Sequence, residues 1–390
     1  MKKFIAVATG AVLAASVCVF AACNDSKDVT KYKYKEVDLS QSQAKAEFVD
    51  ELVEKVDFEN IVGDTSAKDF KLGLAAEAGV KIDINASAKD AMLPGAESAV
   101  DLQAALSYEM NSSAKLKYSA DERAAESETR IAGSLNASDE LFALLGELAK
   151  LDEATVTAIK TATSKFDYTT KTYFDSDYVY MQIPTEILQA LPEDIRGELP
   201  IPDSGKFKTS IGGSADKGYA LNAATAFASR SAAPSSGADN KELIRSYATI
   251  AVEYLSLYNV KVEVSKQNGY AVKLSADSEV IFNAVKGLIP DSSEAFEMIG
   301  EYATFNSLNV ALYFAVDKDG AFKQLSLNVD ADADLSLNLA DLIEEGLPTV
   351  SGSAKISVNL SLKKYSGKIN VPANDPSYVD MNSFHDDSQN

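Results

Sequence analysis

The chain has 390 residues, of which 46% are hydrophobic, and a formal net charge of −21. This length permits a sizeable core in one large or two modest domains. The acidic balance argues against a surface for nucleic acid or anionic lipid, because both need clustered Lys and Arg. With one histidine and two cysteines, a structural zinc site is excluded.

The N-terminus has the form of a secretion signal. A basic pair opens the chain, an apolar run covers residues 4–20, and two alanines stand directly before Cys23. We expect a lipoprotein signal peptide over residues 1–22 and a polar tether over residues 23–39. The run is rich in alanine and is interrupted by polar residues, so it would be a poor permanent membrane helix.

The segment Phe20-Ala21-Ala22-Cys23 resembles the lipobox of bacterial lipoproteins. The resemblance implies cleavage before Cys23 and attachment of a diacylglycerol to its thiol, with two or more acyl chains forming a stable anchor. The expected location is the extracytoplasmic face of the cell membrane. The alternative is an ordinary cleaved signal that leaves a free cysteine, and in both cases Cys23 is the only cysteine of the mature chain.

An amphipathic helix is predicted over residues 40–61. Ser40 and Gln43 have the spacing of a capping box at its start. Phe48, Leu52 and Val56 recur at helical spacing, which predicts one apolar side. We expect this helix to cover an apolar sheet.

The stretch from Phe70 to Tyr118 alternates between apolar and polar residues with a period of two. Side chains of a strand alternate between faces, so the pattern predicts an antiparallel meander with one apolar face. We place a three-residue hairpin turn at Glu77-Ala78-Gly79, with Gly79 in the left-handed region. The candidate ligand-lining residues are those on the apolar face: Leu72, Leu74, Ala76, Val80, Ile82, Ile84, Leu102, Ala104, Leu106 and Tyr108.

The rest of the N-terminal half, residues 40–228, adds strands and helices. The pattern predicts a strand at 131–135, one or two helices over 139–163, a strand pair over 166–183 and a short helix within 184–202. The strand pair turns at 175–177. Residues 229–239 are rich in Ser, Ala and Gly and form the predicted linker.

The C-terminal half, residues 240–372, opens with a predicted helix over 240–258. A hairpin at 260–274 turns at Gln267-Asn268-Gly269, and a longer hairpin at 308–339 turns at Asp317–Gly320, where the parity of the apolar residues flips. Helices are predicted at 278–287, 292–302 and 340–345, a last strand at 354–362 and a polar tail over 373–390. The helix at 240–258 should cover the sheet with one face: Leu243, Ile244, Tyr247, Ile250, Ala251, Tyr254, Leu255 and Tyr258.

The predicted fold class is α+β: a long, curved, unclosed antiparallel sheet with amphipathic helices on its apolar face. The two halves either complete one sheet or form two sheet-and-helix units, and we favour one sheet.

Sequence motifs for catalysis are missing. The only histidine, His385, lies in the tail, and the chain has no G-x-S-x-G motif, P-loop or G-x-G-x-x-G motif. The acidic string Asp330, Asp332 and Asp334 has the spacing of half an EF-hand loop, but Leu335 stands where that loop needs glycine. We interpret the string as a solvated strand face, and expect no enzyme, no metal and no cofactor.

The order of elements resembles that of LolA/LppX-type lipoproteins. The resemblance rests on the lipobox, the helix 40–61, the long hairpin 308–337 and the closing Ile369-Asn370-Val371-Pro372, and it covers residues 40–372 by layout. It implies a monomeric, non-enzymatic protein that holds a lipid or acyl chain between sheet and helices. The alternative is a surface lipoprotein with a filled core that binds a protein or glycan through exposed edges or tyrosines: Tyr173, Tyr178, Tyr180 and Tyr313.

Overall fold

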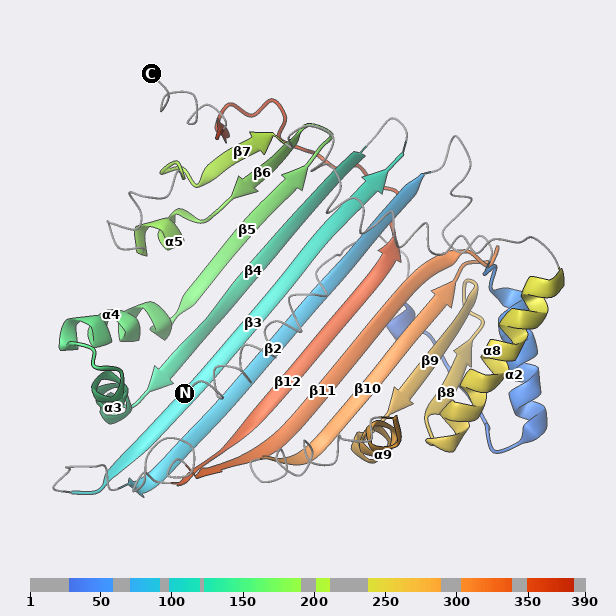
Figure 1. The fold of residues 1–390 in the computed structure, drawn as a ribbon, viewed down its shortest axis with the longest axis horizontal. Helices are drawn as coiled ribbons and strands as arrows, with labels where there is room; N and C mark the ends of the chain where they lie inside the picture. The colour runs from blue at the N-terminus through green and yellow to red at the C-terminus, as the bar shows by residue number, and fades with distance from the viewer. Residues whose placement is uncertain are drawn as a thin grey trace.

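The computed structural model describes most of the chain as one sheet with a few helices (Figure 1). The strands are long and the sheet is not closed. Its order is β1-β8-β9-β10-β11-β12-β2-β3-β4-β5-β6-β7-β13. The described residues are 28–58, 71–91, 98–119, 123–190, 201–210, 238–288, 303–338 and 349–381.

Strands occur throughout the described part of the chain, from β1 near its start to β13 near its end. Their bounds are β1 Lys35–Val37, β2 Leu72–Ala91, β3 Val100–Tyr118, β4 Arg123–Ala137, β5 Phe166–Phe174, β6 Tyr178–Gln182, β7 Lys206–Ser210, β8 Lys261–Ser265, β9 Tyr270–Ala276, β10 Ala303–Val316, β11 Phe322–Asn338, β12 Thr349–Lys364 and β13 Val379–Asp380.

The helices lie toward the ends of the sheet in Figure 1. Their bounds are η1 Val29–Lys31, α2 Ser42–Lys55, α3 Asp139–Ala149, α4 Glu153–Ser164, α5 Thr185–Ala190, α8 Ala238–Leu257 and α9 Ser278–Leu288.

The strands of both halves of the sequence belong to the same sheet. β12, the last long strand, lies between β11 and β2 and pairs with both in antiparallel register. The predicted single sheet is therefore what the structure has. It is a mixed sheet, because β13 pairs with β7 in parallel, and this corrects the expectation of purely antiparallel pairing.

The predicted turn at Glu77-Ala78-Gly79 is wrong, because β2 continues straight through it for 20 residues. A three-residue turn and an uninterrupted strand leave the same parity, so alternation cannot distinguish them. Gly79 pairs with Asn111 on one side and Asn359 on the other. The glycine marks a paired strand interior and not a hairpin.

The other predicted turns are confirmed. The chain reverses between β8 and β9 with Asn268 and Gly269 in the left-handed region, at φ 56° and 120°. It reverses between β10 and β11 with Gly320 at φ 82°. The turn between β5 and β6 has no glycine, and the Asp175 carboxylate instead accepts hydrogen bonds from the backbone N–H groups of Asp177 and Tyr178.

Both ends of the described chain are more ordered than predicted. Residues 28–39, expected as part of the tether, include η1 and β1, and Val29 is fully buried. At the C-terminus, residues 373–381 belong to the expected polar tail, yet Val379 and Asp380 form β13 and Tyr378 is buried. The predicted signal peptide, Cys23, the segment 229–237, the helices at 292–302 and 340–345, and the tail after 381 lie outside the described residues.

Several helix predictions need smaller corrections. Helix α2 begins at Ser42 with Gln41 as its N-cap and no side-chain cap, while the Ser40 hydroxyl donates to Asp38, so the predicted capping box is wrong. The stretch 139–163 forms two helices, α3 and α4, separated by Lys150 in the left-handed region at φ 55°. Ser138 and Asp152 cap them with side-chain oxygens.

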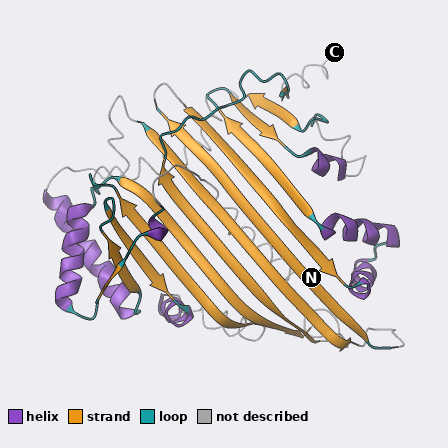
Figure 2. Cartoon of the chain, turned by 180° about the vertical axis from the view of Figure 1, so that it is seen from behind, coloured by secondary structure: helices purple, strands orange, loops and turns teal. Residues whose placement is uncertain are grey.

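Buried clusters lie on both faces of the sheet. One packs Val29 and Tyr32 against β9 and β10 on the outer face, and two lie on the opposite face, which we call the inner face. The larger cluster joins α2 and α8 to β8, β9 and β10, with Phe48, Val252 and Val262 at its centre. The smaller joins α3 to the ends of β2 and β3 through Leu144 and Leu102. Figure 2 shows the opposite, outer face, which the chain crosses at both of its ends.

Candidate functional site

The strand register places apolar side chains in continuous rows across the inner face. One row runs across five strands, from Ile356 on β12 through Ile82, Tyr108 and Gly133 to Phe166 on β5. The neighbouring rows repeat the pattern. In-register antiparallel pairing brings such side chains within contact distance of one another.

This inner face is almost free of charge. Along the chain from β2 to β12, the described strands have two charged side chains at inward positions, Arg123 and Lys364. Both stand at strand ends, and Arg123 lies over the ring of Tyr118. The interior of the face therefore offers nothing to compensate a charged ligand group.

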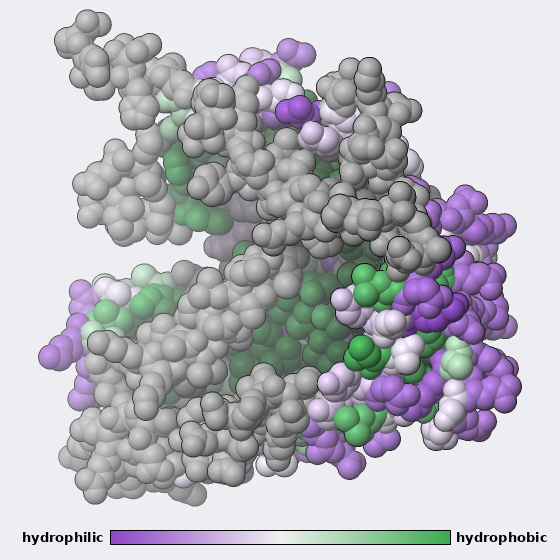
Figure 3. Space-filling model, turned by 45° about the vertical axis from the view of Figure 1, so that its right-hand side comes forward, coloured by the Kyte–Doolittle hydropathy of each residue, from purple (hydrophilic) through white to green (hydrophobic). Residues whose placement is uncertain are grey.

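The centre of the inner face is only half-buried, in contrast to its two ends. Ile82, Ile84 and Leu106 are partly exposed, and Ile356 and Leu325 are each 38% exposed. In Figure 3 hydrophobic residues form a floor that is set back next to the helical end of the molecule. An open apolar surface in such a recess is the kind of feature that marks a binding site.

All ten residues predicted to line a ligand site lie on the inner face by register. Leu72, Leu74, Ile82, Ile84, Ala104, Leu106 and Tyr108 are half-buried, whereas Ala76 and Val80 are buried. Leu102 is buried against α3 and belongs to the smaller core cluster, so it is packing and not free surface. Burial raises the pKa of the Tyr108 phenol above its ordinary value, which is already well above neutral pH.

A group of hydroxyl side chains on the inner face was missed by the sequence analysis. The Ser112 and Thr129 hydroxyls lie 2.9 Å apart, and Thr170 follows in the same row. The signal was present, because all three have the inward parity of their strands. A period-two pattern of apolar residues alone does not include them.

The outer face carries the charges. Arg130 donates two hydrogen bonds to Asp167, at 2.8 and 2.6 Å, and Lys171 pairs with Glu128 at 2.7 Å. Hydrogen bonding and charge from Arg130 lower the pKa of the Asp167 carboxyl. Such exposed pairs contribute little stability each, but they keep this face hydrated.

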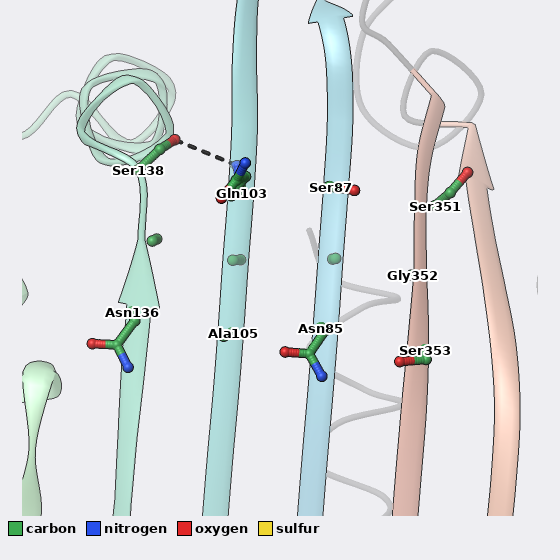
Figure 4. Close-up of a pocket in the computed structure, with 12 residues that line it drawn as sticks. Asn85, Ser87, Gln103, Ala105, Asn136, Ser138, Ser351, Gly352 and Ser353 are labelled. Atoms are coloured by element: carbon green, nitrogen blue, oxygen red, sulfur yellow. Dashed lines mark hydrogen bonds between the residues drawn. The ribbon is translucent and has the colours of Figure 1, made fainter.

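Two shallow depressions lie on the outer face. The larger, of about 620 Å³, is lined at the ends of β12, β2, β3 and β4 by amides, hydroxyls and small residues (Figure 4). Asn85 and Asn136 flank Ala105 in one row of this surface, and none of the twelve lining residues is charged. The second, of about 560 Å³, lies between Asp28 and Arg130.

A buried polar network fixes the N-terminal segment on the outer face. Gln324, which has no exposed surface, accepts a hydrogen bond from the Val29 N–H at 3.3 Å. Its amide nitrogen donates to the carboxylate of Asp28 at 3.1 Å and to the hydroxyls of Ser326 and Ser361. Asp28, with which the described part of the chain begins, is therefore held on the outer face.

The tyrosines considered for a surface interaction are placed differently. Tyr180 and Tyr313 are buried, and Tyr180 packs edge-on against Tyr378 with ring centroids 5.6 Å apart. Tyr173 and Tyr178 are half-buried. Two of the four rings that the alternative function would use are therefore buried in the body of the protein.

The described residues were compared with the requirements of a metal site and of a membrane-spanning helix. Within them, His, Cys, Asp and Glu side chains do not gather into a group of three that could bind a metal ion. Asp330, Asp332 and Asp334 lie along the outer face of β11 and pair across to β12. In the same part of the chain no helix is long and apolar enough to span a bilayer.

Compared with known proteins, the chain matches no protein-family model and no curated protein sequence. Its functional interpretation therefore depends on the surfaces described above.

Proposed function

We propose that this protein is a membrane-anchored extracytoplasmic lipoprotein, without enzymatic activity, that holds a lipid-like ligand on its inner face. The observation that carries the proposal is the uncharged, half-exposed apolar floor between two helix-covered ends of the sheet. The helices would shelter the ligand from water on either side. The LolA/LppX-like order of elements is in keeping with this arrangement.

The mechanism would be hydrophobic sequestration. Each CH₂ group moved from water to an apolar surface contributes about 0.8 kcal/mol, so an acyl chain of ordinary length gains useful affinity from burial alone. The rows of Ile, Leu and Val across β10–β12 and β2–β4 supply that surface. The chemistry favours a neutral ligand, because the floor offers no counter-charge.

The anchor would come from Cys23. That residue precedes Asp28 by five positions, so an extended chain spans at most about 17 Å between them. Because Asp28 is held on the outer face, the body would stay close to the membrane while its inner face remains open. A lipid anchor of two or more acyl chains suffices for stable attachment.

The test uses residues 24–390 without the lipid and compares two variants on one strand. Leu106→Lys places a charge on the inner face, and Ala105→Lys places the same charge one residue away on the outer face. We expect uptake of a fluorescent fatty acyl probe by the unmodified chain and by Ala105→Lys, and at least tenfold weaker uptake by Leu106→Lys. Native mass spectrometry after gentle purification checks for co-purified lipid, and circular dichroism checks that each variant is folded.

A second candidate function is binding of a neutral glycan or protein surface on the outer face. The uncharged depression lined by Asn85, Asn136 and Gln103 favours it, since carboxamides both donate and accept hydrogen bonds. The same two variants separate the candidates, because Ala105 lines this depression. Absence of lipid and probe, with loss of glycan or protein binding in Ala105→Lys alone, would replace the carrier proposal with this one.

A further inference from the structure

Helix α8 carries a second apolar side that faces away from the core. Its inward side, with Ile244, Ala248 and Val252, belongs to the core cluster shared with α2 and the sheet. Five other large residues on the same helix are between 52% and 68% exposed. We call them the α8 stripe: Leu243, Tyr247, Ile250, Tyr254 and Leu257.

The α8 stripe corrects the predicted orientation of the helix. The sequence analysis assigned Leu243, Tyr247, Ile250 and Tyr254 to the side that covers the sheet, together with Ile244 and Leu255. The salt bridges from Arg245 to Asp50 at 3.2 Å and from Lys45 to Glu253 at 2.7 Å fix which side of α8 meets α2. The stripe lies on neither that side nor the core side.

The spacing of the stripe is that of a helix-packing seam. Its residues follow one another at intervals of four, three, four and three, which is the heptad pattern by which one helix packs against another. Two tyrosines lie within it, and tyrosine is enriched at the centres of protein interfaces. A solvated helix surface does not need this pattern.

The composition of the stripe is the same in both directions: Leu, Tyr, Ile, Tyr, Leu. A two-fold symmetric interface needs a patch that is complementary to itself, and an antiparallel pair of these helices meets that need. With Ile250 near the symmetry axis, Tyr247 of one helix would lie opposite Tyr254 of the other, and Leu243 opposite Leu257. If the partner were an unrelated protein, nothing would require the α8 stripe to have this symmetric order.

The area also suits a pair of identical chains. The stripe presents roughly 600 Å² of surface, at the upper end of the apolar patches of ordinary monomers. Two stripes face to face would bury about 1,200 Å², the lower limit of a standard stable interface. An anionic membrane is the poorer occupant, because Glu242 and Glu253 flank the stripe beside the basic residues of α8.

We infer that the α8 stripe is the contact surface for a second copy of this chain, with the two α8 helices antiparallel. This inference would replace the expectation of a monomer. The inference does not depend on the proposed lipid-carrying function.

The test measures the mass of residues 24–390 by sedimentation equilibrium over a range of concentrations. We expect twice the mass of one chain at micromolar concentrations, with dissociation on dilution. Ile250→Glu should raise the dissociation constant at least tenfold, because it places a charge in the apolar seam. The matched control is Ile159→Glu on α4, which is 40% exposed and outside the stripe, and it should leave the mass unchanged.

Cross-linking provides a second measurement. The chain 24–390 has no cysteine of its own, so Ile250→Cys should give a covalent dimer with a copper–phenanthroline oxidant, and Ile159→Cys should not. A single-chain mass at all concentrations would overturn the inference, as would a dimer that Ile250→Glu leaves intact. Binding of the single chain to phosphatidylglycerol vesicles through this stripe would overturn it in favour of a membrane contact.

Discussion

The network around Gln324 is the clearest case of single residues that decide a feature of the molecule. A fully buried amide would be unfavourable without partners, and here Gln324 has a backbone N–H, a carboxylate and two hydroxyls. The charged partner is Asp28. Burial would raise the pKa of Asp28, but hydrogen bonds from Thr30 and Gln324 and the charge of Lys363 together lower it.

The Asp28 carboxyl therefore predicts an acid-sensitive attachment of the N-terminal segment. Its pKa is lower in the folded chain, so the stability that it contributes is present above its ordinary pKa of 3.8. That stability is lost as the pH falls through the lowered value. Urea unfolding between pH 6 and pH 2.5 should show a steeper acid loss for the unmodified chain than for Asp28→Asn.

Since other carboxylates also titrate in this range, the difference between the two curves is the measure. Ser42→Ala, at an exposed position in the first turn of α2, is the control and should follow the unmodified chain. Identical slopes for the unmodified chain and Asp28→Asn would show that Asp28 does not stabilise this attachment through its charge.

At the scale of the strand, two glycines on β4 and β2, which lie on either side of β3, differ in the space around them. Gly133 on β4 lies beneath the ring of Phe166, and a Cβ at Gly133 would stand 2.7 Å from the ring and in contact with the Ser107 carbonyl. Gly79 on β2 has room, since a Cβ there would meet Asn111 Oδ1 at 3.4 Å. Neither glycine has a positive φ. The available space, and not backbone strain, therefore determines whether alanine is tolerated at each position.

This difference predicts the effect of adding one methyl group. Gly133→Ala should lower the free energy of unfolding by about 1–3 kcal/mol, because Phe166 and a neighbouring backbone must move. Gly79→Ala should stay within about 0.5 kcal/mol of the unmodified chain, since alanine also restricts the unfolded state. Denaturant unfolding measures the free energy of unfolding of both variants. An equal decrease in the two would contradict this packing.

At the scale of the whole molecule, β12 joins the two halves of the sequence. It pairs with β11 over fifteen residues and with β2 over fourteen. The first half of the chain thus completes its sheet with a strand from the far end of the sequence. A disturbance of β12 therefore acts on both halves at once.

Proline substitution in β12 tests this dependence. Ala354→Pro should cost about 3 kcal/mol or more, because a central strand loses a ladder hydrogen bond and the proline ring disturbs its neighbour. Glu36→Pro in the three-residue edge strand β1 should cost clearly less. Thermal unfolding followed by circular dichroism measures both, and a similar fall in Tm for the two variants would mean that β12 does not hold the halves together.

Much of the candidate site could be predicted from the local sequence pattern. The parity of Leu72 to Tyr108 placed ten residues on one face, and the register confirms that shared face. The position of Leu102 beneath α3 was not accessible, because parity does not say which part of a face a distant helix covers. The hydroxyls of Ser112 and Thr129 were also missed, since an apolar-only reading of the pattern excludes them.

The sequence by itself determined the long strands, most of their turns and the apolar side of the sheet, because side-chain alternation and turn chemistry act between near neighbours. The short strands β1, β7 and β13 were not predicted. Only the tertiary structure decided that β12 lies beside β2, that residues 28–31 pack on the outer face, and which side of α8 is buried. Helix α8 has apolar residues on two sides, so its own periodicity cannot select one. The contacts with α2 and the sheet select it, and they leave the other side open to solvent.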